Sequence, residues 1–157
     1  MKIGVVVYSW SGNTLTVAEK LKERLSSAGH AVDLLQVQVH GERKRGAQAF
    51  ELEAAPDLTP YDGLVLGAAV EAFSLSPVLT RFLEREDSLE GKKIACLTTQ
   101  QFPYPWMGGN RAVRQMRKLC EAKGAEVVGA AVVNWAKSRR GQTMADAIER
   151  LNALFSL

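Results

Sequence analysis

The feature that most constrains this chain is the alternation of short, continuous apolar runs with segments of helical periodicity. Five runs are predicted as buried strands: Lys2–Tyr8, Ala31–Val37, Leu64–Ala69, Lys92–Thr98 and Val127–Val133. Because they are apolar throughout rather than at every second residue, they are typical of parallel strands covered on both faces. The sequence therefore predicts an α/β fold, with a parallel sheet between two layers of helices.

Segments with apolar residues three and four positions apart separate these strands. The predicted helices are Asn13–Ala28, Pro77–Glu84, Asn110–Lys123 and Thr143–Phe155. One irregular stretch, Gln38–Pro60, is long for a loop, and Ala47–Leu52 within it is expected to form a helical turn or two. No repeat or linker divides the chain, so we expect a single domain over residues 1–157.

Composition excludes several classes of protein. With 46% hydrophobic residues, the chain of 157 residues can build a core, which argues against disorder. Its 20 basic and 17 acidic residues give a net charge of +3, too even to indicate nucleic acid as a partner. No apolar run approaches the roughly 18 residues that span a bilayer, and no signal peptide is recognisable, so we expect a cytoplasmic protein without a membrane partner. Cys96 and Cys120 lack metal-ligand spacing and are expected to be buried thiols.

Polar residues gather directly after the first predicted strand, in the loop Ser9-Trp10-Ser11-Gly12-Asn13-Thr14. The loop leads straight into a helix, whose first N–H groups are unpaired and favour an anion. Its three hydroxyl groups can donate hydrogen bonds to phosphate oxygens, and Gly12 permits close approach of the backbone. Because the loop has no cation, it suits a phosphomonoester that is bound rather than transferred. An ordinary capped helix start is the alternative.

Other phosphate-binding loops do not fit this segment. The Walker pattern G-x-x-x-x-G-K-[ST] and the dinucleotide pattern G-x-G-x-x-G are both absent. Neither cysteine lies in the loop, which excludes the nucleophile of phosphatases with similar architecture. A receiver domain needs clustered acids after the first strand, and the loop has none.

The loop resembles the phosphate loop of the flavodoxin family, [ST]-x-[ST]-G-x-T. Two later segments are similar to flavodoxin-like proteins: Tyr61–Ala68 resembles the third strand, and Thr98–Gln101 with Gly108-Gly109 resembles the fourth-strand loop and helix start. The resemblance covers the whole chain and is to short-chain flavodoxins. It implies a flavodoxin-like three-layer sandwich with five parallel strands in the order 2-1-3-4-5, and FMN as the cofactor.

Two segments are expected to contact the flavin ring, because small residues let the backbone approach a flat ring and aromatic residues can cover its face. The candidates after the third and fourth strands are Ala68, Ala69, Val70, Glu71, Phe73, Thr98, Thr99, Gln100, Gln101, Phe102 and Trp106. Many flavodoxins have an aromatic residue near the position of Glu71, so the stacking partner stays open. Phe73 and the proline-stiffened segment Phe102–Trp106 are candidates, and packing against the following helices is the alternative. Trp10 is a further candidate contact, and Asn134 and Trp135 are expected at the same edge.

The resemblance implies an FMN-binding electron-transfer protein, supplied by a redox partner protein or by reduced nicotinamide. The alternatives are a small FMN-dependent NAD(P)H:quinone-type reductase and a non-redox binding domain that has lost flavin. No residue is predicted as a catalytic acid, base or nucleophile, since the cofactor supplies the chemistry. The chain is expected to be a monomer or a homodimer.

Basic residues form three groups: Arg43-Lys44-Arg45, the face of Arg111, Arg114 and Lys118, and Lys137–Arg140. They are either solvated faces or docking sites for an acidic partner or a nucleotide phosphate. Because mobile carriers of the flavodoxin family are usually acidic, the basic charge argues against that specific role.

Overall fold

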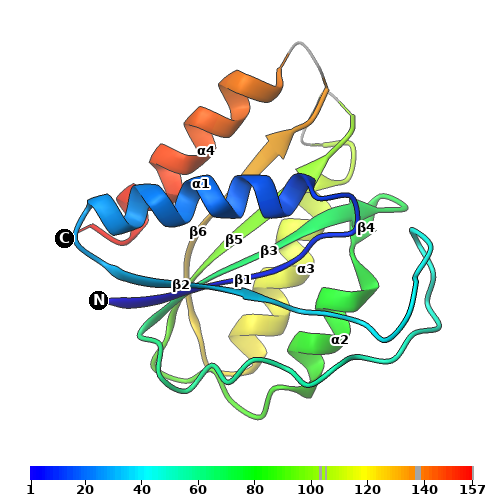
Figure 1. Ribbon diagram of the computed structural model, residues 1–157, viewed down its shortest axis with the longest axis horizontal. Helices are drawn as coiled ribbons and strands as arrows, with labels where there is room; N and C mark the ends of the chain where they lie inside the picture. Colours follow the sequence, from blue (N-terminus) through cyan, green and yellow to red (C-terminus); the bar gives the residue numbers. More distant parts are fainter. Residues whose placement is uncertain (103, 105, 137–138, 157) are drawn as a thin grey trace.

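Five long strands form the central sheet of the computed structural model, which describes residues 1–102, 104, 106–136 and 139–156 (Figure 1). They are β1 (Lys2–Tyr8), β2 (Ala31–Gln36), β3 (Gly63–Glu71), β5 (Lys93–Gln100) and β6 (Glu126–Asn134). All neighbours pair in parallel in the order β2-β1-β3-β5-β6, which confirms the predicted order of the five strands. The short strand β4 (Ser74–Leu75) pairs antiparallel with the end of β3, in addition to the five parallel strands that the sequence predicts.

Four helices cover the two faces of the sheet (Figure 1). On one face, α1 (Asn13–Ser27) and α4 (Arg140–Leu154) pack through buried residues such as Leu21 and Leu151. On the other, α2 (Pro77–Arg85) and α3 (Gly109–Ala122) pack through Phe82 and Met116. The two apolar cores explain why the strands are apolar on both faces, as the sequence predicts.

The segment between β2 and β3 contains no helix over residues 47–52, and the predicted helical turn was wrong. Instead, Val39 and Leu52 form an antiparallel bridge, flanked by hydrogen bonds from His40 N to Glu51 O and from Glu53 N to Gln38 O. The segment therefore folds back on itself as a narrow flap, residues 39–52. Six residues are too few to nucleate a helix when the backbone has other partners. In Figure 1 the flap swings out in cyan beside β4 and then returns past α2 to β3.

Two strands extend beyond their predicted ends, so that Val70 and Glu71 lie in β3 and Thr99 and Gln100 lie in β5. Ala68 pairs with Thr98, and Ala69 pairs with Thr99. The side chains of Ala68 and Thr98 are completely buried. Their side chains pack within the sheet, and the approach of a flavin ring to the backbone at these two positions stays a prediction.

The cysteines Cys96 and Cys120 are free and buried, as predicted. No helix in the described part of the chain has the length and apolar character needed to cross a membrane.

Candidate functional site

The loop from Ser9 to Thr14 connects β1 to α1 at the carboxyl edge of the sheet. Gly12 precedes the helix with φ 91°, a left-handed conformation that favours glycine, and a side chain placed there would meet no atom within 4 Å. The hydroxyl of Ser9 accepts a hydrogen bond from Leu15 N, and Gly12 O accepts one from Thr16 N. These bonds stabilise the loop at residues behind its tip. Among the described residues, no acceptor is found for the N–H groups of Asn13 and Thr14, as is usual in the first turn of a helix.

The helix start is tied to the neighbouring strands through Thr14. Its buried hydroxyl shares a hydrogen bond of 2.9 Å with that of Thr99 at the end of β5. This contact joins two of the predicted site segments, which are 85 residues apart. Thr14 Oγ1 is consequently engaged in positioning the loop, whereas Ser11 lies at the exposed tip.

A pocket opens beside this loop, where the ends of β3 and β5 meet. Its volume is about 300 Å³, and its described lining residues are Arg45, Val70, Ala72, Phe73, Gln100, Gln101 and Phe102. Five of these were predicted from the sequence as ring contacts. Arg45 and Ala72 were not. The pocket has the apolar walls with a few polar groups that are typical of a site for a small planar ligand.

The turn that forms one wall of the pocket is conformationally strained. Ala72 and Phe73 connect the paired residues Glu71 and Ser74, and both have positive φ angles, 49° and 62°. Such a two-residue turn normally contains asparagine and glycine. The turn presents the ring of Phe73 to solvent, where it stacks on Phe102 with centroids 5.2 Å apart.

Gly108 and Gly109 bring the start of α3 against this wall. A side chain at Gly108 would lie 2.7 Å from a methyl group of Val70, and one at Gly109 would lie equally close to Val132. Gln100 supports the loop that follows β5, because its side-chain amide donates to the carbonyls of Phe102 and Tyr104. These contacts explain why the glycine pair that the sequence singled out is needed here.

Trp106 is farther from the pocket than predicted. Its side chain is 72% exposed and stacks on Tyr104, with centroids 5.8 Å apart, and it is not among the lining residues. Pro103 and Pro105, to which the expected stiffness of this segment was attributed, lie outside the described residues, as do Lys137 and Ser138.

Glu71 does not face the pocket. Its carboxylate forms a bidentate ion pair with Arg43, at 2.8 and 3.2 Å, and both side chains are only 2% exposed. Gly46 N also donates to Glu71, at 2.6 Å. Burial favours the neutral acid, but the hydrogen bonds from Arg43 and Gly46 outweigh this effect and lower the pKa of Glu71. The expected contact of Glu71 with the cofactor is therefore corrected: its oxygens are already engaged by the flap.

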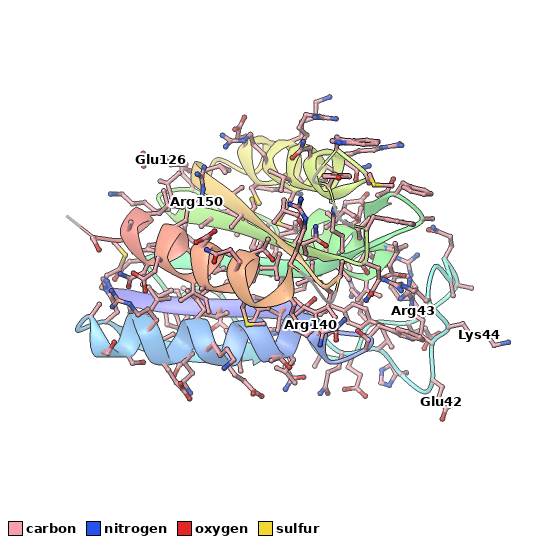
Figure 2. The ribbon with its side chains drawn as sticks, turned by 90° about the horizontal axis from the view of Figure 1, so that it is seen from above. Glu42, Arg43, Lys44, Glu126, Arg140 and Arg150 are labelled. Atoms are coloured by element: carbon pink, nitrogen blue, oxygen red, sulfur yellow. The ribbon has the colours of Figure 1, made fainter. Side chains whose placement is uncertain are left out.

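Arg43 is buried although the sequence around it suggested a solvated or docking cluster. Its guanidinium also donates to Tyr8 Oη and lies over the ring of Phe50. In Figure 2, Arg43 points toward the body of the protein, whereas Glu42 and Lys44 point away from it. Three consecutive charged residues carry no signal that one of them is buried, because its acidic partner is 28 residues away.

The flap also contacts the phosphate loop. The indole N–H of Trp10 donates to Arg43 O at 2.6 Å, and the guanidinium of Arg45 lies 5.8 Å from the centre of the Trp10 ring. Trp10, a predicted cofactor contact, is therefore tied to the flap through its polar edge. At the other side of the site, Trp135 N donates to Gln100 O, which places Trp135 beside the end of β5.

These features fit FMN. The unpaired N–H groups of Asn13 and Thr14 suit its terminal phosphate, and the pocket of aromatic and small side chains suits its ring. Both lie at the carboxyl edge of the sheet, where ligands bind in open parallel α/β folds. Among the described residues, no group of three or more metal-ligating side chains is present.

Comparison with known proteins agrees with this fit. The sequence model of a family described as NADPH-dependent FMN reductase matches residues 1–140. This match and the solved structures below confirm the flavodoxin-like resemblance and FMN as the predicted cofactor.

Solved structures show the same fold over nearly the whole chain. Oxidised flavodoxin 2 from Bacillus cereus has a TM-score of 0.70 at 24% identity, covering 99% of this chain and 97% of that one. A flavodoxin from Streptococcus pneumoniae TIGR4 has a TM-score of 0.71 at 17% identity, covering 98% and 96%. A flavoprotein from Lactobacillus acidophilus, solved in complex with FMN, has a TM-score of 0.63 at 19% identity, covering 83% and 92%.

Proposed function

Because the chain belongs to the NADPH-dependent FMN reductase family, we propose that it is an FMN-dependent reductase that oxidises a reduced nicotinamide and reduces a quinone-type acceptor. The observation that carries the proposal is the pocket of Val70, Phe73 and Gln100–Phe102, which lies at the same edge of the sheet as the start of α1. It combines a place for a planar redox ring with open access from solvent.

The residues of the chain bind and orient rather than react. Asn13 and Thr14 offer N–H groups to the phosphate, and Phe73 and Phe102 form an apolar wall against a flat ring. The FMN, when bound, supplies the capacity to accept and release two electrons. In the net reaction, NADPH, one proton and a quinone give NADP⁺ and a hydroquinone, so both electrons and both hydrogens are accounted for.

The described lining of the pocket contains no carboxylate, imidazole or thiol. Arg45 is its one ionisable side chain, and a guanidinium stays protonated at physiological pH. The proton that completes the hydroquinone therefore comes from solvent in this proposal. We expect the rate to lack the steep pH dependence that a titrating general acid would cause.

Turnover without a second protein tests the proposal. Purified protein loaded with FMN is mixed with NADPH and a quinone such as menadione, and the absorbance of NADPH is followed. Catalytic consumption at a rate far above that of free FMN supports the reductase. Consumption no faster than with free FMN, despite stoichiometric FMN binding, would refute it.

An electron carrier is the second candidate, because the fold matches short flavodoxins over almost their full length. In that case the protein would exchange electrons with a partner protein rather than turn over with NADPH. Stoichiometric reduction by a flavodoxin reductase with no direct NADPH oxidation is the expected signature. The third alternative, a domain that has lost flavin, relied on Glu71 in the ring site, and Glu71 lies outside the pocket.

A further inference from the structure

Buried polar contacts hold the flap of residues 39–52 beside the pocket. Arg43 pairs with Glu71 at the end of β3, and its Nε donates to Ala47 O within the flap. Gly46 N donates to the same carboxylate. At the far side of the flap, Arg81 of α2 donates to Phe50 O at 2.7 Å. The conformation of the flap tip is therefore determined by partners on β3 and α2.

These contacts place one particular cation at the pocket. Arg45 lies between Arg43 and Gly46, the two residues that contact Glu71, and its Nη2 donates to Val70 O at 3.3 Å. Its guanidinium has five N–H donors, so this one contact leaves others for a ligand. Arg45 is exposed, and it is the one charged side chain among the described residues that line the pocket.

Neighbouring charges do not neutralise this cation. No ion pair of Arg45 is found within the described residues, and the carboxylate of Glu71 is already matched by Arg43. The nearby exposed acid, Glu42, points away from the protein in Figure 2. An uncompensated positive charge thus lies at the side of the pocket that is assigned to the flavin ring. It favours a negative charge on a second flat ligand that lies over the flavin.

We propose that Arg45 recognises an anionic substituent of the electron acceptor, so that the protein prefers flat aromatic quinones carrying a carboxylate or sulfonate. Glu71 and Arg43 are positioning residues for Arg45, because they determine where the flap tip lies. This inference rests on the proposed reductase activity. The reaction is the net reaction given above, and the anionic substituent is unchanged by it.

A matched pair of acceptors tests the preference. The KM for 1,2-naphthoquinone-4-sulfonate and for neutral 1,2-naphthoquinone is measured with the FMN-loaded protein, its Arg45→Gln variant and its Lys44→Gln variant. Lys44→Gln removes the same charge one residue away, from a side chain that points out to solvent. We expect Arg45→Gln alone to raise the KM for the sulfonate, by roughly three- to fivefold as for an exposed charge pair. Arg45→Lys, which keeps the charge, is expected to restore most of the preference.

A binding measurement separates this inference from the reductase proposal. Equilibrium dialysis compares 2-naphthoate with neutral 2-naphthamide, neither of which accepts electrons from NADPH. Preferential binding of the anion that is lost in Arg45→Gln supports the inference even when turnover fails. The inference would be overturned if Arg45→Gln raised the KM for both acceptors equally, or if it changed the KM for NADPH only. It would also be overturned if Arg45→Gln bound 2-naphthoate as tightly as the original protein does.

Discussion

Glu71 and Arg43 form a bidentate ion pair that is almost completely removed from solvent, with the shorter N–O distance at 2.8 Å. The pair joins the end of β3 to a flap that precedes it by 28 residues. Because both oxygens of Glu71 accept hydrogen bonds, the carboxylate keeps its charge in the folded state. Together with the bond from Trp10 to Arg43 O, this pair joins the loop after β1 to the flap and to the end of β3 beside the pocket.

Removing one partner of this pair is expected to destabilise the fold. Glu71→Gln leaves the charge of Arg43 buried without a counter-ion, which should lower the free energy of unfolding by about 3 kcal/mol. Urea unfolding measures the change. The control is Glu149→Gln, which breaks the exposed pair with Arg24 and should change stability little. Equal stability of Glu71→Gln and the original protein would contradict a role for the pair in folding.

The same pair predicts a stability that depends on acid pH. The pKa of Glu71 is lowered in the folded protein, so the unfolded chain takes up the proton first as the pH falls. The contribution of Glu71 is complete above its ordinary pKa of about 4.5 and is lost as the pH falls through the lower folded value. Urea unfolding between pH 7 and pH 3 should therefore show a steeper loss for the original protein than for Glu71→Gln. Parallel pH profiles would show that Glu71 does not contribute.

Gly12 is expected to contribute to the affinity for FMN as well as to the stability of the fold. Gly12→Ala and Gly91→Ala both introduce a side chain at a positive φ in open space, so each should cost about 1 kcal/mol of unfolding free energy. Only Gly12 lies in the phosphate loop. Quenching of FMN fluorescence should therefore show weaker binding, by about tenfold, for Gly12→Ala alone. The same loss of affinity for riboflavin, which has no phosphate, would argue against the assignment of this loop.

Substitutions in the strained turn at Ala72 and Phe73 are expected to affect stability and FMN binding differently. Ala72→Gly removes a side chain at φ 49° and should raise the free energy of unfolding by about 0.5 kcal/mol or more, with FMN affinity retained. Phe73→Gly relieves similar strain but removes the wall of the pocket, so FMN binding should weaken. Thermal unfolding and flavin titration of both variants give the comparison. Unchanged FMN affinity in Phe73→Gly would remove Phe73 from the ring site.

Neither thiol is expected to react in the folded protein. Burial raises the pKa of Cys96 to about 12, and it also raises that of Cys120. At pH 8 almost no thiolate is present, and both sulfur atoms are covered. Mass spectrometry after iodoacetamide treatment should find no adduct without denaturant and two in urea. Rapid labelling of the native protein would indicate that the core around α3 opens.

Local patterns in the sequence were sufficient for most of the layered fold. The continuous apolar runs predicted the five long strands, and the polar loop with Gly12 predicted the start of α1. Such predictions succeed because strand and helix periodicity, and the turn chemistry of glycine, act between residues close in the chain. The strand order came from resemblance, and the pairing of the strands agrees with it.

The flap and the charge at the pocket were decided by the tertiary structure alone. The sequence shows Arg43, Lys44 and Arg45 as three equivalent cations, yet one is buried, one points to solvent and one lines the pocket. Their different surroundings arise from Glu71 and Val70, which the place of β3 in the sheet brings beside the flap. A buried ion pair between distant residues depends on the geometry that brings them together, and no local periodicity encodes that geometry.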